Sequence, residues 1–372
     1  MDEVIDLKNW RRGLTIFLFT IFYLFLSPLF RENYAWQEER GAKFRKLWEF
    51  QVGEATNFTS SIAILTQPIC DAEKVYFASE NGTFYALNIV SGERVWEFTA
   101  GSPVRQSATL GDHSLFVATS GMEALSLDLI TGNLRWRRRM DGEIFTPLIF
   151  NKGALYFGFS RYIACLRASD GEEIWRFETG DEVHAPPIIE GEFLYAGSDD
   201  GFLYALTPRE GRLRWKFSTS GKIVAAPLLF EGTLFVGSYD NYIYALHPDS
   251  GKQKWKKITG GDVNCRPIGW EKWVFVSSLD NFLYCLQVKN GYLSYRFRLP
   301  YRLYHSPVIS GDLLFMAPLS DTLVVIDPIN GEKVGGFTAP SLITSPPGLS
   351  PNGDIIFIGT NKGLLIALKL IS

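Results

Sequence analysis

Residues 221–260 read GKIVAAPLLFEGTLFVGSYDNYIYALHPDSGKQKWKKITG, and the fold can be predicted from this stretch. It contains four short apolar runs, at 225–230, 233–237, 242–246 and 253–258, which are separated by turn residues such as Asp, Asn, Ser and Gly. Strands this short, joined by tight turns, can pair only as antiparallel neighbours. The stretch therefore predicts one four-stranded antiparallel sheet.

The same pattern recurs along the chain with a period of about forty residues. A glycine precedes each predicted fourth strand, at Gly92, Gly132, Gly171, Gly211, Gly251, Gly291 and Gly331. Four residues after each glycine come Trp96, Trp136, Trp175, Trp215, Trp255, Tyr295 and finally Gly335. A second series runs in phase with the first, at Pro147, Pro187, Pro227, Pro267, Pro307 and Pro347. Two phased series indicate a true structural repeat.

The number of repeats follows from the third predicted strand, which occurs eight times between Leu87 and Leu368. A four-stranded sheet cannot bury both of its faces alone, so successive sheets must stack around an axis. The predicted fold class is all-β, an eight-bladed β-propeller of four-stranded antiparallel blades. The eighth copy has no fourth strand, whereas an unmatched copy lies upstream around Trp48. We therefore expect residues 44–52 to complete the last blade and close the ring.

An uncharged segment lies near the N-terminus, where residues 13–30 read GLTIFLFTIFYLFLSPLF. As a helix it would span about 27 Å, close to the roughly 30 Å of a bilayer core. It predicts one N-terminal transmembrane helix or signal anchor before the propeller, with a cleaved signal peptide as the alternative. Lys8, Arg11 and Arg12 precede the segment and favour a cytoplasmic N-terminus, although basic residues that follow it weaken the asymmetry.

The predicted fourth strands carry basic residues beside their aromatic residue, as in Arg135-Trp136-Arg137. With the two-residue period of a strand, the Trp packs on one side while the basic neighbours face water. Lys and Arg at a blade's exposed edge oppose edge-to-edge pairing. The run 137–139, three consecutive arginines, has a second interpretation as a contact for anionic lipid or phosphate.

The segment from Ala86 to Trp96 fits the pattern Ala-x-Asn/Asp-x-x-Ser/Thr-Gly-x-x-x-Trp, and Ser126 to Trp136 fits nearly as well. This pattern resembles the docking motif of the pyrroloquinoline-quinone-type (PQQ-like) propeller repeat. The resemblance covers about residues 44–372 and implies that each aromatic ring stacks between neighbouring blades. The docking-motif residues are then Trp48, Gly92, Trp96, Gly132, Trp136, Gly171, Trp175, Gly211, Trp215, Gly251, Trp255, Gly291 and Tyr295.

The PQQ-like family has two branches with different functions. One contains quinoprotein dehydrogenases, which hold the quinone and a calcium ion. The other is non-catalytic and is best known in the outer-membrane-protein assembly factor BamB. This chain resembles the BamB branch more, because its repeats are short and it has no adjacent Cys-Cys pair. It departs from the usual BamB lipoprotein, because no Cys follows residues 13–30 at lipoprotein distance and Cys70 comes far too late.

The expected organisation follows from these observations. It comprises a cytoplasmic segment 1–12, a transmembrane helix or signal anchor 13–30, a linker 31–43 and a propeller 44–372. We expect the propeller in the periplasm, tethered to the inner rather than the outer membrane. A cytoplasmic propeller is the alternative orientation.

Side chains that could carry chemistry are few. The cysteines Cys70, Cys165, Cys265 and Cys285 are expected to be free thiols, and the four histidines lack metal-ligand spacing. We predict no catalytic, cofactor-binding or metal-binding residue. Polar residues on the innermost strands are candidates to line a central channel, either as a water-filled axis or as a ligand site. They are Arg105, His184, Asn264, Arg266 and His305.

The predicted function is a non-catalytic, membrane-anchored scaffold that mediates protein–protein interactions in the cell envelope, in a BamB-like role. The expected partners are envelope proteins, including outer-membrane assembly machinery. A net charge of −3 gives no reason to expect nucleic acid. The alternative is a PQQ-dependent quinoprotein oxidoreductase that binds PQQ and calcium, and a propeller that senses unfolded clients is a third hypothesis.

Overall fold

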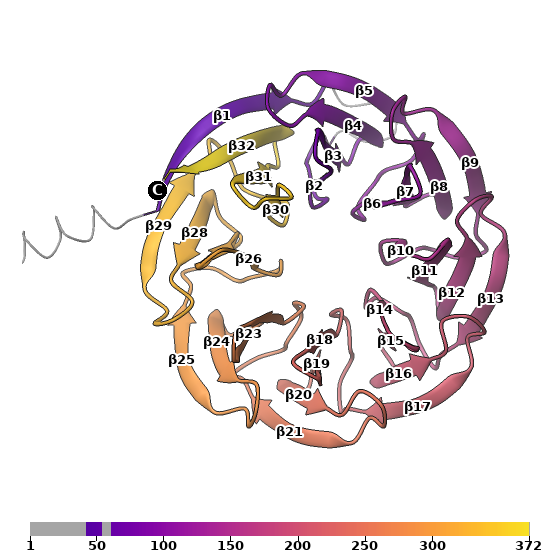
Figure 1. Cartoon of the computed structure of the whole chain (residues 1–372), viewed down its shortest axis with the longest axis vertical. Helices are drawn as coiled ribbons and strands as arrows, with labels where there is room; N and C mark the ends of the chain where they lie inside the picture. Colours follow the sequence, from indigo (N-terminus) through magenta and orange to yellow (C-terminus); the bar gives the residue numbers. More distant parts are fainter. Residues whose placement is uncertain (1–41, 54–60, 372) are drawn as a thin grey trace, which may run out of the picture.

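The chain forms a ring of eight four-stranded antiparallel sheets (Figure 1), in a computed structural model that describes residues 42–53 and 61–371. The predicted all-β, eight-bladed propeller is thus confirmed. Residues 13–30, with their predicted membrane helix, lie outside the described residues, as do residues 1–12 and most of the expected linker 31–43. Among the described residues there is no helix with the length and apolarity that crossing a membrane requires.

The blades follow one another around the ring in chain order. Blades one to four comprise β2–β5 (Ile69–Cys70, Lys74–Ala78, Thr83–Asn88, Arg94–Thr99), β6–β9 (Thr109–Gly111, Ser114–Thr119, Glu123–Asp128, Leu134–Arg139), β10–β13 (Ile149–Asn151, Ala154–Phe159, Tyr162–Arg167, Glu173–Glu178) and β14–β17 (Ile188–Glu190, Phe193–Gly197, Phe202–Leu206, Leu213–Ser218). Blades five to eight comprise β18–β21 (Leu228–Phe230, Thr233–Gly237, Tyr242–Leu246, Gln253–Ile258), β22–β25 (Ile268–Trp270, Trp273–Ser277, Phe282–Gln287, Leu293–Arg298), β26–β29 (Val308–Ser310, Leu313–Met316, Thr322–Ile326, Lys333–Thr338), and β30–β32 (Gly348–Leu349, Ile355–Gly359, Leu364–Ile371) with β1 (Lys43–Gln51).

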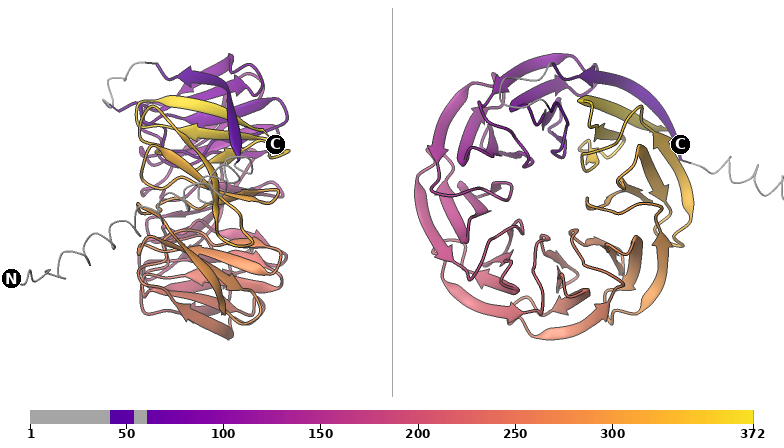
Figure 2. Two further views of the ribbon diagram at one scale, coloured as in Figure 1. Left: turned by 90° about the vertical axis from the view of Figure 1, so that its left-hand side faces the viewer. Right: turned by 180° about the vertical axis from the view of Figure 1, so that it is seen from behind.

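Within a blade the first strand lies nearest the axis and the fourth strand forms the outer rim (Figures 1 and 2). Because neighbouring strands run in opposite directions, the turns of a blade lie on two opposite faces. One face carries the second-to-third-strand turns and the links to the next blade, and we call it the linker face. The other carries the remaining turns, and we call it the turn face.

The hydrophobic core lies between blades rather than within one blade. One buried cluster, for example, joins Phe235 and Ala245 of blade five to Val274 and Tyr284 of blade six. The middle strands are accordingly almost fully buried, whereas the outer strand β21 alternates between exposed and half-buried residues. A blade therefore needs both neighbours to bury its apolar faces.

The ring is closed by the N-terminal strand. β1 pairs antiparallel with β32, from Lys43 opposite Ile371 to Gln51 opposite Leu364, and is the outer strand of the eighth blade. The observed bounds differ by one residue at each end from the expected segment 44–52. Hydrogen bonds and packing alone therefore join the two ends of the propeller.

Blade seven is adapted to this closure. Gly335 occupies the position that an aromatic residue holds in the preceding blades, and it forms a parallel bridge with Ala42. The Ala42 amide donates to the Val334 carbonyl at 2.6 Å, and the Phe44 ring packs edge-on against Phe337. A Cβ atom at position 335 would lie only 2.5 Å from the Ala42 carbonyl oxygen. Gly335 thus leaves room for the chain to enter the ring.

Candidate functional site

The docking-motif residues form a repeated contact between consecutive blades. The Trp96 indole Nε1 donates to the Leu129 carbonyl of the next blade at 3.1 Å, and its ring lies against Gly132. Gly132 has a φ of +72°, and a Cβ atom there would lie 2.6 Å from the ring. Seven junctions have this arrangement: Trp48–Gly92, Trp96–Gly132, Trp136–Gly171, Trp175–Gly211, Trp215–Gly251, Trp255–Gly291 and Tyr295–Gly331. These residues hold the blades together, so their role is structural.

Substitution of Gly211 by alanine should destabilise the propeller more than the same change at Gly191. Both glycines have positive φ, +65° and +60°, so both changes carry a similar backbone strain of about 1–2 kcal/mol. A Cβ atom at 211 would also lie 2.5 Å from the Trp175 ring, whereas the space around position 191 is open. We expect an additional loss of about 1–3 kcal/mol in Gly211→Ala. Urea unfolding of both variants measures the difference, and equal losses would rule out ring contact as the reason for the glycine.

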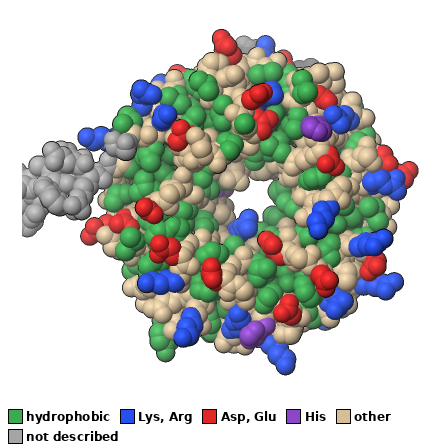
Figure 3. Space-filling model, in the orientation of Figure 1, with side chains coloured by type: hydrophobic (Ala, Val, Ile, Leu, Met, Phe, Trp, Pro, Cys, Tyr) green, Lys and Arg blue, Asp and Glu red, His purple; other side chains and the backbone are tan. Residues whose placement is uncertain are grey.

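A central channel runs along the axis, and Figure 3 shows that it is open. A cavity of about 360 Å³ in it is lined by residues at the start of the innermost strands. Asn264 and Arg266 are among them, together with Gln67, Tyr304 and Ser306. Burial lowers the pKa of the Arg266 guanidinium, while the negative charge of Glu190 acts in the opposite direction. Two of the five predicted channel residues thus line this cavity.

The other three predicted channel residues are not among the residues that line this cavity. Arg105 donates two hydrogen bonds to one carboxylate oxygen of Glu80, at 3.0 and 2.9 Å. His305 is half-buried, and burial lowers its pKa to about 4, so its imidazole is neutral near pH 7. His184 belongs to a polar cluster on the linker face.

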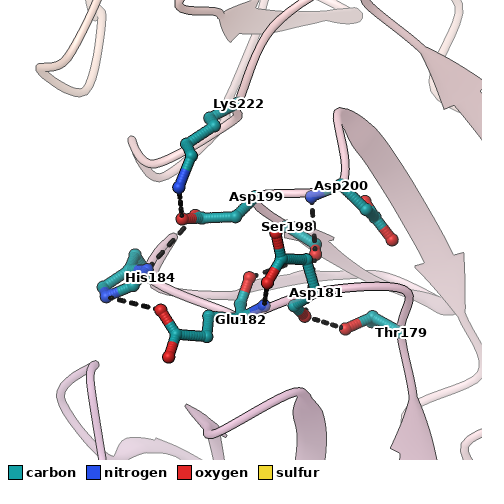
Figure 4. A network of polar contacts seen from close by, with 8 residues as sticks. All are labelled: Thr179, Asp181, Glu182, His184, Ser198, Asp199, Asp200 and Lys222. Atoms are coloured by element: carbon teal, nitrogen blue, oxygen red, sulfur yellow. Dashed lines mark hydrogen bonds and ion pairs between the residues drawn. The ribbon is translucent and has the colours of Figure 1, made fainter.

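This polar cluster joins blades four and five (Figure 4). His184 Nδ1 lies 3.2 Å from Asp199 Oδ1, and Lys222 Nζ donates to Asp199 Oδ2 at 2.7 Å. The Asp199 side chain is only 3% exposed, and its hydrogen bond with Lys222, together with its negative charge, raises the pKa of Lys222. Glu182 approaches the other side of the imidazole, with 3.9 Å between Glu182 Oε2 and His184 Nε2. The ring of His184 also stacks on Phe145, with 4.2 Å between the ring centroids.

Sequence reasoning identified His184 but not the other three charged residues of the cluster, Glu182, Asp199 and Lys222. Asp199 lies in the turn after β15, and such Asp-rich turns are ordinary hairpin chemistry in a sequence. Lys222 lies in the link between β17 and β18, a full repeat further along than Glu182. Glu182 and Lys222 are forty residues apart, which equals the repeat length. This spacing is the one sequence signal that could have indicated that the two residues occupy equivalent positions in neighbouring repeats.

The cluster is the one group of the described residues whose His and carboxylate atoms are close enough to share a metal ion. Its arrangement does not favour a metal. The Lys222 ammonium already neutralises Asp199, and the two ring nitrogens of His184 face different carboxylates, so one ion could use only one of them. Calcium in particular needs six to eight oxygen ligands. The group therefore does not fit the calcium ion of a quinoprotein dehydrogenase.

All four cysteines are free thiols, as the sequence predicts. Burial raises the pKa of the Cys165, Cys265 and Cys285 thiols to about 12, so they remain protonated at neutral pH. Cys165 and Cys285 lie opposite Trp175 and Tyr295 in the strand ladders. They therefore serve as small packing residues rather than as nucleophiles.

Comparison with known proteins identifies the family. The family model described as outer membrane protein assembly factor BamB matches residues 23–157 and 160–266, well over half of the chain. This chain belongs to that family. A BamB of Nitrosomonas eutropha is 26% identical over 169 residues, which are 45% of this chain and 38% of that protein. The matched segment therefore spans less than half of this relative, as it does for the BamB of Bordetella pertussis.

Enzymes share parts of the repeat. A tetrathionate hydrolase of Acidithiobacillus ferrooxidans is 30% identical over 33% of this chain and 25% of its own length. A 1-butanol dehydrogenase (quinone) of Thauera butanivorans is 25% identical over 32% of this chain and 22% of its own length. Among solved structures, BamB of Moraxella catarrhalis has a TM-score of 0.76 at 15% identity, covering 88% of this chain and 98% of that one. This last likeness shows the shared fold.

Proposed function

We propose that this chain is a non-catalytic propeller scaffold of the cell envelope that docks other proteins in a BamB-like role in outer-membrane protein assembly. The observation that carries the proposal is the match to the BamB family model, which covers well over half of the chain. Regular blades held by seven aromatic–glycine contacts support it, because a rigid ring presents its loops in fixed positions.

The linker face around the polar cluster is the docking surface that we propose. Tyr239 lies beside the cluster, since its amide donates to the Lys222 carbonyl, and its side chain is 37% exposed. Asp181 and Glu182 are also exposed there. A partly exposed tyrosine beside fixed charges is typical of the few residues that dominate a protein interface. The acidic groups favour a partner that presents Arg or Lys.

We propose further that residues 13–30 anchor the chain in the inner membrane and that the propeller lies in the periplasm. The apolar length of that segment and the family of the propeller support this placement. The anchor takes the place that a lipid holds in a lipoprotein. Protease protection in intact and permeabilised spheroplasts tests the orientation.

Site-specific photocrosslinking tests the docking role. A photoreactive amino acid at position 239 in the full chain, within native membranes, should capture outer-membrane assembly components. The matched position is Tyr292, which is 68% exposed and lies on the turn face. It should capture them at least several-fold less. Capture at 292 alone would move the docking surface to the other face, and absence of any assembly component at both positions would reject the proposed role.

The second candidate function, a quinone-dependent oxidoreductase, is favoured by the likeness to the 1-butanol dehydrogenase. The polar cluster does not fit the calcium ion of such an enzyme, because Lys222 already neutralises Asp199. Full-length protein mixed with the quinone and calcium should show no bound-quinone absorbance and no dye-linked alcohol oxidation above background. A positive result in both assays would replace the scaffold proposal.

A further inference from the structure

The outer strands of blades four, five and six carry an unusual set of charges. β17, β21 and β25 contain Arg214, Lys216, Lys254, Lys256, Lys257, Arg296 and Arg298, and no acidic residue. All of these except Lys257 are exposed. The three strands form a continuous sector of the rim in Figure 1. We call these seven residues the basic arc.

The basic arc differs from the rest of the rim in extent: three consecutive outer strands each carry two or three cations and form no ion pair within the described residues. Several outer-strand cations elsewhere are paired, such as Arg94 with Glu97, Arg135 with Asp128, and Arg176 with Asp141 and Glu173. Others, such as Arg138 and Arg139 on β9, form no ion pair within the described residues. No cation of the basic arc forms an ion pair with any carboxylate that the structure describes. Protection of a strand edge accounts for Lys and Arg on an outer strand. It does not require three consecutive outer strands without an acidic residue, and β5 and β13 carry Glu97 and Glu173.

Aromatic rings hold three of these cations in equivalent positions on consecutive blades. Lys216 Nζ lies 4.1 Å from the centroid of the Phe202 ring, and Lys256 Nζ lies 4.3 Å from that of Tyr242. The Arg296 guanidinium carbon lies 4.4 Å from the Phe282 centroid. A cation over a ring is attracted to it but keeps its charge. The basic arc is therefore an ordered row of positive charges that no carboxylate side chain of the described residues neutralises.

We propose that the basic arc docks edge-on against an anionic lipid surface. Dispersed, unpaired Lys and Arg side chains are attracted to a leaflet of anionic headgroups, and each contributes a comparable increment. Nucleic acid is disfavoured, because Phe202, Tyr242 and Phe282 are covered by their cations and are not free to stack on bases.

The position of the chain entry supports this occupant. Ala42 joins the rim at Gly335 of blade seven, directly beside the blade that carries β25. Ala42, the first described residue, therefore lies one blade beyond the end of the basic arc. Docking by the edge leaves both loop faces free for proteins, so this lipid contact is separate from the docking function proposed above.

Lysine footprinting of the full-length protein in nanodiscs tests the proposal. Acylation rates are compared between phosphatidylcholine discs and discs that also contain phosphatidylglycerol. Lys216, Lys254 and Lys256 should react about fivefold more slowly in the anionic discs. Lys152 and Lys289, exposed on the turn face, should be unchanged. The protection should vanish at 1 M salt, where the Debye length is about 3 Å.

Two triple variants distinguish a lipid contact made by the basic arc itself from a general effect of the protein's positive charge. K254Q/K256Q/K257Q should abolish protection of Lys216 in anionic discs. R137Q/R138Q/R139Q removes the same charge from β9 in blade two and should leave that protection intact. Equal acylation of the wild-type lysines in both kinds of disc would overturn the proposal. An equal loss of Lys216 protection in both triple variants would overturn it as well. Protection by single-stranded DNA but not by anionic discs would assign the arc to nucleic acid instead. Each of these readouts is independent of the crosslinking at position 239.

Discussion

Replacing Gly335 with tryptophan should destabilise the propeller, although tryptophan is the usual residue at this position of the repeat. Ala42 fills the space that the ring would need, because its carbonyl oxygen, Cβ and amide nitrogen all lie within 3.0 Å of where a Cβ atom would be. Insertion of the ring would expel the chain entry and break the Ala42–Val334 hydrogen bond. We expect a loss of about 1–3 kcal/mol in the free energy of unfolding, measured by urea denaturation.

The matched control is Tyr295→Trp, the same consensus change in the preceding blade. Tyr295 already lies against Gly331, and its hydroxyl donates to the Pro328 carbonyl. An indole at position 295 should lower the free energy of unfolding by no more than about 1 kcal/mol, because it repeats the contact that Trp255 makes one blade earlier. If Gly335→Trp proved as stable as wild type, the entry of the chain at blade seven would have to differ from that described here.

Truncation of Trp48 to alanine should have the second large effect, because this residue holds the strand that closes the ring. Its indole donates to the Ile89 carbonyl at 3.1 Å and its ring covers Gly92 of blade one. We expect a loss of about 3 kcal/mol in the free energy of unfolding. The amides of β32 that pair with β1 should also exchange faster with solvent, since hydrogen bonds and packing hold β1 to its own blade and no short turn connects it to β32.

Trp215→Ala is the comparison that isolates the effect of closure. Trp215 makes the same contacts, a hydrogen bond to the Pro248 carbonyl at 3.0 Å and a ring against Gly251. Its strand β17 continues directly from β16 through a short turn, so loss of the ring should not release it. Both variants should lose similar global stability, but only Trp48→Ala should show local opening. Similar exchange in the third strand of blade four would mean that closure is no weaker than any other junction.

Most of the fold could be predicted from the sequence because each blade repeats a local pattern. The two-residue alternation, the turn residues and the spacing of Gly92, Gly132 and their equivalents are short-range features. The upstream copy around Trp48 is likewise visible without coordinates, because the eighth repeat lacks a fourth strand. These features determine the number of blades and the place at which the ring closes.

Only the tertiary structure showed what lies between blades. The contact of Asp199 with His184 and Lys222 and the space that Gly335 leaves for Ala42 involve residues from different blades or from distant parts of the chain. The same holds for the absence of ion pairs in the basic arc within the described residues. Such contacts depend on how neighbouring sheets are rotated and on where side chains point. A repeat pattern specifies each sheet, but the closed ring decides which side chains of neighbouring sheets meet.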